Sequence, residues 1–410
     1  MSQTMVEISP SHATYPEASA AVSAADLIAR ARQLVPLLAQ RAAQAEQAQK
    51  VPDETIADFQ RAGFFRVLQP KRFGGYEMDP EVFYQIQMTI AEGCMSSAWV
   101  YGVVAVHNWQ LALFDERAQQ EVWGENGTVL TSSTYMPVGK VVPVEGGFQF
   151  SGRWGFSSGS EHCDWVLLGG LIPPKAGETA PEYRTFLVPR RDYQVVRNWD
   201  VLGLKGTGSH DIVVEGAFVP DYRTHKSIDG FMCNSPGNAV NTAPLYRLPF
   251  AQIFVRAVST ASIGALQGAV NLFREQAAKR VSVNTGQKTT EDVGAQLACA
   301  EAQAAVDEMR LVLLRNFSSM MQAARDGQSI PVETRVEYRF QSAAVAERCA
   351  THVNRLLRYC GGRGIYLSNP ITRTFLDLHA ARAHVANNID PFGRNYGGVL
   401  MGQKNTDFFI

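Results

Sequence analysis

A short motif in the middle of the chain has the residue types of a hydrolase active site. Residues 155–159 read Gly-Phe-Ser-Ser-Gly and match the G-x-S-x-G pattern in which a serine is the nucleophile. The residues that follow supply a candidate base and a candidate acid: His162, Cys163 and Asp164. The nucleophile needs a strained turn between a strand and a helix, yet the apolar run 165–172 that comes next is typical of a strand. The context argues against a serine hydrolase, which stays an alternative.

The other motifs for phosphate or metal binding are weak. The glycine-rich segment 202–212, LGLKGTGSHDI, fits neither a phosphate-binding loop nor a dinucleotide-binding turn, so it predicts a turn before a strand. None of the six cysteines forms a C-x-x-C pair. His379 and His384 would diverge by roughly 140° on a helix, which does not suit a shared metal ion. We therefore expect reduced cysteines and no metal site.

Bulk properties favour an enzyme that acts on small molecules. The 410 residues carry a net charge of -1, which does not suggest a surface for nucleic acid or for an anionic membrane. Residues 1–20 lack the pattern of a signal peptide, and no apolar run has membrane-spanning length. We expect a cytoplasmic protein with no nucleic-acid or membrane partner, and a loose tail over residues 1–22.

Periodicity divides the rest of the chain into three parts. Residues 23–127 have helical spacing, with Ser23 as the N-cap of the first helix. Residues 128–222 form short apolar runs separated by glycine and proline, with a hairpin signal at Gly146-Gly147, and predict an antiparallel β-barrel or sandwich. Residues 223–410 return to helical spacing and predict an antiparallel bundle. Its predicted core stripe consists of Val293, Leu297, Ala300, Ala304, Leu311 and Leu314.

Four segments, in order along the chain, resemble the acyl-CoA dehydrogenase fold. They are GRWGFSSGS at 152–160, LGLKGTGSHDIVVEGAFVP at 202–220, KRVSVNTG at 279–286 and GGRGIYLSNPITRTFLDLH at 361–379. The resemblance extends from about residue 25 to residue 390. It implies an α+β architecture with an N-terminal α-helical domain, a middle antiparallel β-barrel domain and a C-terminal four-helix bundle.

Two further segments are similar to the oxygenase components of two-component flavin monooxygenases. They are VHNWQLALFDERAQQEVWGE at 106–125 and SSTYMPVGK at 132–140. Such oxygenases hydroxylate phenolic compounds, among them 4-hydroxyphenylacetate and phenolic secosteroids. The resemblance implies reduced flavin (FMNH2 or FADH2) that diffuses from a separate NAD(P)H:flavin reductase, and O2 as co-substrate. It also implies a flavin C4a-hydroperoxide, an aromatic substrate and a homotetramer.

Residues near the C-terminus separate this prediction from dehydrogenation. In many dehydrogenases of the fold, a glutamate in a Y-E-G-T string abstracts the substrate proton. Aligning Asp377 with the aspartate that precedes this string brings residues 384–387, His-Val-Ala-Asn, to the same place, and valine cannot be a base. The alternatives are a dehydrogenase or oxidase of this fold, an indole- or heteroaromatic monooxygenase, and a flavin or steroid binder without catalysis.

The resemblance also implies roles for individual residues. The implied catalytic residues are His107 as base for the substrate hydroxyl, Ser158 as hydrogen-bond partner of the flavin N5 region, and His384 beside the peroxide. The implied substrate contacts are Trp99, Ser133, Tyr135 and Phe250. The implied flavin contacts are Phe156, Ser157 and Ser158 at the ring, Arg247 and Arg280 at the phosphates, and Gly361 and Gly362 at the cofactor tail across a subunit interface.

Overall fold

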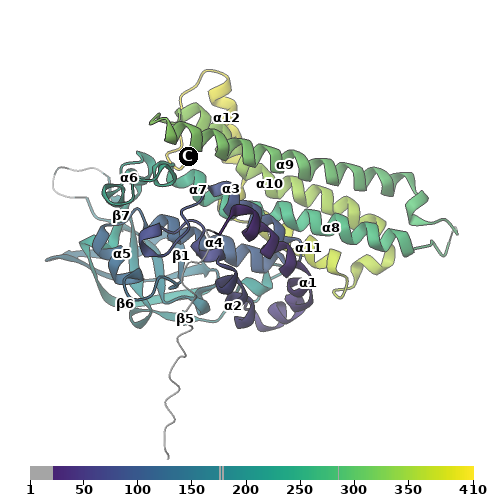
Figure 1. Ribbon diagram of the computed structural model, residues 1–410, viewed down its shortest axis with the longest axis horizontal. Coiled ribbons are helices and arrows are strands. Elements are labelled where there is room, and N and C mark those ends of the chain that lie inside the picture. Colours follow the sequence, from purple (N-terminus) through teal and green to yellow (C-terminus); the bar gives the residue numbers. More distant parts are fainter. Residues whose placement is uncertain (1–21, 175–176, 178–179, 285) are drawn as a thin grey trace, which may run out of the picture.

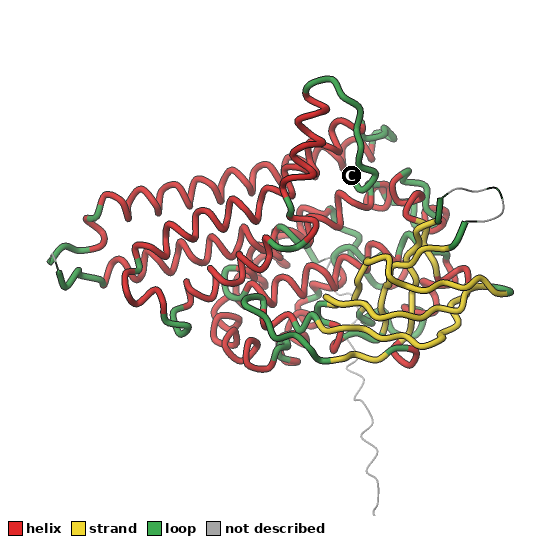
Figure 2. Tube along the Cα trace, turned by 180° about the vertical axis from the view of Figure 1, so that it is seen from behind, coloured by secondary structure: helices red, strands yellow, loops and turns green. Residues whose placement is uncertain are grey.

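A β-sheet with covering helices forms one end of the molecule, and long helices extend from it to form the other (Figures 1 and 2). The computed structural model describes residues 22–174, 177, 180–284 and 286–410. The N-terminal helices are α1 (Ala24–Ala48), α2 (Asp53–Ala62), α3 (Pro80–Ala91), α4 (Met95–Leu111) and α5 (Glu116–Trp123). The strands are β1 (Thr131–Val144), β2 (Gly147–Ser157), β3 (Trp165–Ile172), β4 (Glu182–Pro189), β5 (Gln194–Val196), β6 (His210–Pro220) and β7 (Thr224–Lys226). The later helices are α6 (Ser227–Phe231), α7 (Phe250–Ala257), α8 (Thr260–Lys279), α9 (Val293–Arg325), α10 (Val332–Tyr359), α11 (Pro370–Arg382) and α12 (Ile389–Leu400).

The first helix begins where the sequence predicts. The Ser23 hydroxyl accepts a hydrogen bond from the backbone N–H of Asp26, whose carboxylate accepts one from the Ser23 backbone in return. This capping box satisfies backbone donors that the first helical turn leaves without partners. The prediction of Ser23 as N-cap is therefore confirmed.

Helix α4 is the element that the other layers enclose. All of its residues from Met95 to Leu111 are buried. It contacts α3, α7 and α8 on the helical side and β1 on the sheet side. A helix that is apolar on every side is stable only in the interior of a protein. Polar side chains on α4 are consequently held away from bulk water.

The sheet differs from the expected antiparallel pairing at one place. In the described residues it has seven strands in the order β5-β6-β2-β1-β3-β4-β7. Strand β1 pairs with β2 through the predicted hairpin at Gly146-Gly147, but it pairs with β3 in parallel, Thr131 opposite Trp165. Strand β6 occupies the edge of β2 that β1 leaves open. The chain after β2 therefore passes the start of β1, and β3 pairs with the other edge of β1. Alternation of apolar residues cannot report this, because it does not identify a strand's partner.

The C-terminal bundle is confirmed, but its predicted stripe is wrong. Helices α8, α9, α10 and α11 pack against one another. On α9, Val293, Leu297 and Leu311 are 76%, 50% and 67% exposed. The face that packs inside is mainly alanine in the first half of the helix and carries larger side chains in the second half: Ala295, Ala298, Ala302, Ala305, Val306, Met309, Leu313, Asn316, Phe317, Met320, Met321 and Ala324. In the first half of α9, small side chains allow the helices to approach closely, and Val293 and Leu297 lie on the outer face.

The most apolar helical segment of the described chain is a core element. Phe250–Lys279, which comprises α7 and α8, is long and apolar enough to cross a membrane by length and composition alone. However, 94% of its most apolar window is buried inside the protein. Burial against α3, α9, α10 and α11 accounts for its composition.

The close contact between α8 and α3 yields a stability prediction. A Cβ atom at Gly264 of α8 would lie 1.9 Å from the backbone oxygen of Met88 of α3. We expect Gly264→Ala to lower the free energy of unfolding by about 2 kcal/mol or more, because the two backbones must move apart. Chemical denaturation measures this change. The control is Gly397→Ala in α12, where a Cβ would meet no atom within 4 Å and helix propensity predicts an unchanged or higher stability. Equal effects at the two glycines would contradict the packing argument.

Candidate active site

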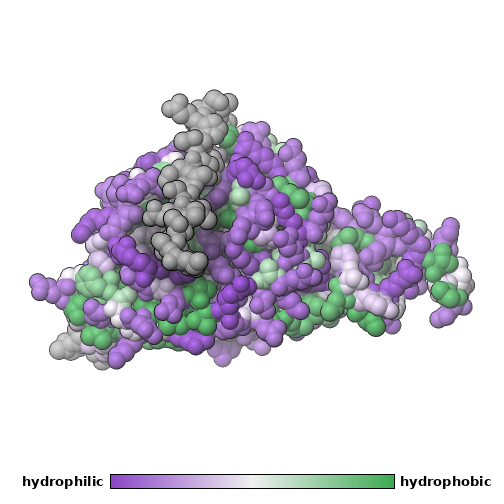
Figure 3. Space-filling model, turned by 90° about the horizontal axis from the view of Figure 1, so that it is seen from below, coloured by the Kyte–Doolittle hydropathy of each residue, from purple (hydrophilic) through white to green (hydrophobic). Residues whose placement is uncertain are grey.

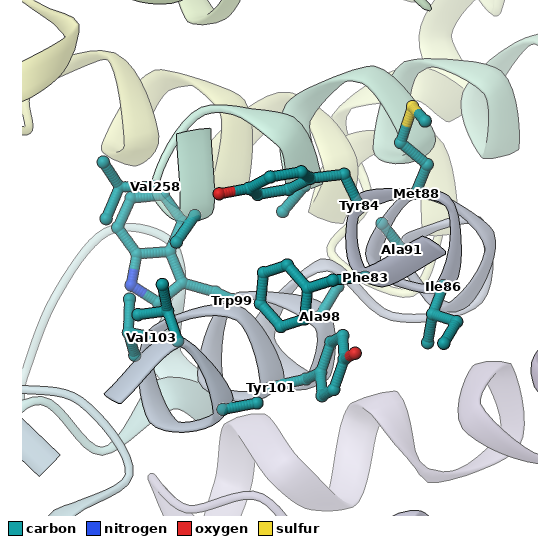
Figure 4. Packing of buried hydrophobic residues seen from close by; sticks show 14 of the residues in the cluster. Phe83, Tyr84, Ile86, Met88, Ala91, Ala98, Trp99, Tyr101, Val103 and Val258 are labelled. Atoms are coloured by element: carbon teal, nitrogen blue, oxygen red, sulfur yellow. The ribbon is translucent and has the colours of Figure 1, made fainter. Parts of the chain in front are cut away.

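One face of α4 brings together several of the predicted site residues. Trp99, Val103 and His107 are spaced by four residues, so they lie along the same side of the helix. Figure 4 shows Trp99 and Val103 on this side, with Val258 beside the indole, while Tyr101 lies on the other side among core aromatics. The spacing is visible in the sequence, but only the fold shows that this side faces the sheet.

The end of β2, together with the loop that follows it, presents an aromatic ring to the surface. Phe156 has a positive φ of 66° and a side chain that is 67% exposed, and its ring packs edge-on against Trp199 at 5.9 Å between centroids. Positive φ is uncommon for a residue with a Cβ and costs energy. Gly159 three residues later fits against α4, since a Cβ there would lie 2.8 Å from Val100. The loop is thus fixed on α4 with an aromatic ring facing outward.

The two serines of this loop bond to other hydroxyl groups. Ser157 is fully buried, and its hydroxyl donates to the Ser132 hydroxyl at 3.3 Å. The Ser158 oxygen accepts a hydrogen bond from the Trp99 indole N–H at 3.2 Å and lies 2.7 Å from the Ser209 oxygen. Ser209 belongs to the glycine-rich segment before β6, so this segment, the loop after β2 and α4 meet at Ser158.

The arrangement around these serines does not support a hydrolase. A short 3₁₀ turn, Ser160–His162, and then strand β3 follow the serines, instead of the helix that a nucleophile turn requires. The His162 ring faces Asp53 at 3.2 Å, and the Cys163 thiol donates to the Gly159 carbonyl. Among the described residues, neither serine has a histidine as a hydrogen-bond partner. The polar residues after the motif therefore serve the packing of the turn.

Trp99 also contacts the third predicted catalytic residue. Its ring meets the His384 ring edge-on, with 5.7 Å between centroids. His384 Nδ1 accepts a hydrogen bond from the Ala386 backbone N–H at 3.1 Å, so the neutral ring carries its proton on Nε2. Desolvation, together with the positive charge of Arg339, lowers the pKa of His384 to about 4. His384 is consequently neutral at pH 7 and can donate a hydrogen bond from Nε2.

His107 has the opposite tautomer. Its side chain is fully buried, and Nδ1 lies 2.8 Å from the backbone carbonyl oxygen of Thr131, which can only accept. The proton is therefore on Nδ1, and Nε2 is left as a buried acceptor without a hydrogen-bond partner in the described residues. Burial lowers the pKa of His107 to about 4. An unpaired buried acceptor is costly unless a ligand completes it.

Aromatic side chains from several elements surround a cavity whose wall includes Tyr135, a neighbour of His107, although His107 itself does not line it. The Tyr135 ring lies 6.3 Å from the His107 ring and meets Phe250 and Phe254 edge-on at 6.0 and 4.7 Å. Ser133 lies two residues before Tyr135 on the same face of β1. The cavity has a volume of about 230 Å³, and its lining residues include Gln110, Tyr135, Tyr183, Phe250, Phe408 and Phe409.

Some lining residues were not predicted from the sequence. Gln110 hydrogen-bonds the Tyr135 hydroxyl, and it lies one helical turn after His107. Phe254 does not line the cavity, but it stacks parallel to the lining residue Phe250 at 5.8 Å and follows it by four residues. Helical spacing from the predicted residues could have identified both. Phe409 at the end of the chain carried no such signal, because only tertiary folding brings it against Phe250.

The predicted phosphate and tail residues do not line this cavity. Arg280 donates to the backbone carbonyl of Tyr359 at 2.7 Å, and its guanidinium would lie 2.1 Å from a Cβ at Gly361. Gly361 has a positive φ of 64°, so two requirements favour glycine there. A Cβ at Gly362 would meet nothing within 4 Å. Arg247 is exposed at the end of the 3₁₀ turn Pro244–Arg247, so the structure joins Arg280 to Gly361 but leaves Arg247 apart.

These residues fit a flavin. An exposed aromatic ring, a hydroxyl that accepts hydrogen bonds and a fixed positive charge are the groups that an isoalloxazine ring and a phosphate require. They are provided by Phe156, Ser158 and Arg280, respectively. His107 Nε2, which has no partner in the described residues, can accept a hydrogen bond from a second, polar molecule.

Comparison with known proteins identifies the family. The family models for the acyl-CoA dehydrogenase N-terminal and C-terminal domains match residues 26–126 and 257–389. The chain is 35% identical to the flavin-dependent monooxygenase oxygenase subunit HsaA of Rhodococcus jostii, over 92% of this chain and 98% of that protein. This chain belongs to the family of flavin-dependent monooxygenase oxygenase subunits.

Other members of this monooxygenase family agree with that assignment. The oxygenase component of the FADH2-dependent resorcinol hydroxylase from a Rhizobium species is 30% identical, over 92% of this chain and 94% of that protein. The crystal structure of the HsaA monooxygenase from Mycobacterium tuberculosis has a TM-score of 0.90 at 33% identity, over 95% of this chain and 100% of that chain. The predicted acyl-CoA dehydrogenase-like fold is therefore confirmed. The protein is a flavin-dependent oxidoreductase, and the hydrolase and dehydrogenase alternatives are not supported.

The buried His107 of this monooxygenase makes stability depend on pH. Its pKa is about 4 in the folded protein, below the usual value of 6.5, so the unfolded chain binds the proton more readily. Stability is therefore lost as pH falls below 6.5. The destabilisation caused by His107→Asn, measured by chemical denaturation, should shrink by about 2 kcal/mol between pH 7 and pH 5. The control is His379→Asn, whose ring is partly exposed. A destabilisation by His107→Asn that does not change with pH would contradict a neutral buried ring.

Proposed function

We propose that this oxygenase subunit hydroxylates a phenolic compound with FADH2 that a separate NAD(P)H:flavin reductase supplies. The names of the relatives, a flavin-dependent monooxygenase and an FADH2-dependent resorcinol hydroxylase, support the cofactor and the aromatic substrate. The observation that carries the substrate class is the unpaired Nε2 of His107, whose ring lies behind that of Tyr135, a residue that lines an aromatic cavity. When bound, reduced flavin supplies the activation of O2, and the protein supplies orientation, dryness and proton control.

His107 is the proposed acceptor for the substrate hydroxyl. Because Thr131 fixes the proton on Nδ1, Nε2 is available to accept a hydrogen bond from a phenol O–H. Proton transfer toward Nε2 makes the phenol oxygen negative, and this charge in turn raises the basicity of the ring. A phenol that approaches a phenolate is a better nucleophile at its ring carbons. The three proposed substrate contacts beside it are Ser133, Tyr135 and Phe250.

Trp99 and His384 are proposed to form the side of the site that faces the flavin. The Trp99 indole donates a hydrogen bond to Ser158 and contacts the His384 ring. Its flat apolar ring therefore lies between Ser158 and His384. His384 presents an N–H donor at Nε2 that can bind an oxygen atom derived from O2. The proposed flavin contacts are the ring of Phe156 and the Ser157-Ser158 segment.

The flavin phosphates are proposed to bind at Arg280, with Gly361 and Gly362 at the cofactor tail. The hydrogen bond to the Tyr359 carbonyl fixes the guanidinium beside Gly361, which is a favourable arrangement for a phosphate group. Arg247 is a second proposed phosphate contact, from an exposed turn. We expect Arg247 to contribute less to phosphate binding than Arg280, because among the described residues only Arg280 contacts the segment that contains Gly361.

A homotetramer in the cytoplasm is also proposed. Val293, Leu297 and Leu311 form an exposed apolar face on α9, and hydrophobic patches follow the arm of C-terminal helices in Figure 3. Exposed apolar faces of this kind are typical of subunit contacts. Free cysteines in the described residues agree with a reducing compartment, where the reductase would also be present.

Replacement of His107 tests the substrate role. We expect His107→Ala to slow formation of the hydroxylated product on the order of a hundredfold, because the substrate hydroxyl loses its acceptor. Release of hydrogen peroxide should continue, so product per flavin consumed falls. Rapid mixing of enzyme and FADH2 with O2 and a panel of phenols and indoles measures both products. His379→Ala is the control. A normal rate with phenols, or a preference for indoles, would contradict the proposed substrate class.

Replacement of Ser158 tests the flavin contact. We expect Ser158→Ala to weaken binding of FADH2 by about tenfold, the value of one hydrogen bond. It should also raise hydrogen peroxide release relative to product, because the ring is held less firmly. Anaerobic fluorescence titration measures the affinity. Ser160→Ala, at a buried serine of the next turn, is the matched control. Unchanged affinity in Ser158→Ala would remove this serine from the flavin site.

A further inference from the structure

Three buried hydroxyl groups form a chain that ends at Ser158. The Thr207 oxygen lies 2.8 Å from the Leu204 carbonyl oxygen and 2.7 Å from the Ser209 oxygen. The Ser209 oxygen lies 2.7 Å from the Ser158 oxygen, which accepts from Trp99. All three hydroxyls are buried, with Thr207 1%, Ser209 4% and Ser158 7% exposed. Their hydrogen bonds are therefore made within this chain of groups.

Counting protons gives one set of directions in which every hydrogen bond of the chain is satisfied. A hydroxyl has one proton to donate, and a backbone carbonyl can only accept. The Leu204 carbonyl also accepts from the Trp199 indole N–H at 2.9 Å and from the Thr207 backbone N–H at 3.1 Å. The Thr207 hydroxyl oxygen lies 2.8 Å from the same carbonyl, a contact that is favourable only if the hydroxyl donates, and Thr207 then accepts from Ser209. Ser158 must then donate to Ser209, because the Ser209 proton is already used. The Trp99 indole N–H occupies one lone pair of Ser158. What remains on Ser158 is one lone pair and no proton.

The start of the chain is anchored in the tertiary structure. Leu204 has a positive φ of 55°, and its backbone N–H donates to the buried Asp377 carboxylate at 2.6 Å. Gly206 fits against α1, since a Cβ there would lie 2.9 Å from Ala45. These contacts hold the Leu204 carbonyl toward Thr207. The donor and acceptor in each hydrogen bond between the three hydroxyl groups follow from this fixed acceptor.

We propose that Thr207 and Ser209 are positioning residues that make Ser158 a hydrogen-bond acceptor only, so that the site prefers reduced over oxidised flavin. This inference rests on the proposed contact between Ser158 and the flavin N5 region. Reduced flavin carries a hydrogen on N5 and can donate to the free lone pair of Ser158. Oxidised flavin has a lone pair on N5, and two acceptors repel each other. Oxidised product flavin then leaves the site, and reduced flavin replaces it.

Variants of Thr207 separate the direction of the chain from its shape. Valine has nearly the shape of threonine but cannot accept the Ser209 proton. In Thr207→Val, Ser209 can donate to Ser158, which frees the Ser158 proton to face N5. We expect oxidised FAD to bind about tenfold more tightly and FADH2 more weakly. Thr207→Ser keeps the hydroxyl and should retain the wild-type ratio of the two affinities.

Anaerobic titrations with FAD and with dithionite-reduced FADH2 measure these ratios without turnover. Ser209→Ala provides a second variant, since it removes the acceptor of the Ser158 proton and should shift the ratio in the same direction. If Thr207→Val and Ser209→Ala both keep the wild-type ratio while Ser158→Ala weakens FADH2 binding, the directional chain is refuted and the Ser158 contact stands. If Ser158→Ala changes neither affinity, the flavin contact itself is wrong.

Discussion

The complete burial of α4 is the constraint on which the site depends. This helix lies between the sheet and the C-terminal helices, and it carries Trp99 and His107 on the side that faces the sheet. In such an environment a polar group must find a partner or remain neutral, since an unpaired charge is too costly. The Thr131 carbonyl and the Ser158 hydroxyl are the partners that the fold supplies. The position and protonation of the site residues follow from this burial.

Two histidines illustrate how the backbone determines chemistry. Both have a pKa of about 4 and are neutral at pH 7. His107 lies beside a carbonyl and therefore keeps its proton on Nδ1, whereas His384 lies beside a backbone N–H and keeps it on Nε2. One ring thus offers an acceptor and the other a donor, although the side chains are chemically identical. A reaction that moves a proton and an oxygen atom in one site can use such a complementary pair.

The sequence predicted the family and several local features correctly. It did not predict which strands and helices pack together when they are far apart in the chain. The N-cap at Ser23 and the hairpin at Gly146-Gly147 depend on residues close in the chain, and both were predicted correctly. The parallel pairing of β3 with β1 was missed, because either edge of β1 suits an apolar strand. The core stripe of α9 was misplaced onto residues such as Val293 and Leu297, because the alanines that are buried in this half of the helix carry a weaker signal than larger apolar residues.

By itself, the sequence determined which residue types could do chemistry and the order of the segments that mark a flavin-dependent monooxygenase. Ser158 was a candidate from its motif alone, with a hydrolase and a flavin site as competing interpretations. Only the tertiary structure argues against the hydrolase, because among the described residues it places Ser209 and Trp99, and no histidine, at the Ser158 oxygen. The flavin contact stays a proposal. A hydroxyl has no fixed role until its neighbours determine where its proton points. These neighbours are 51 and 59 residues away in the chain, and folding alone brings them together.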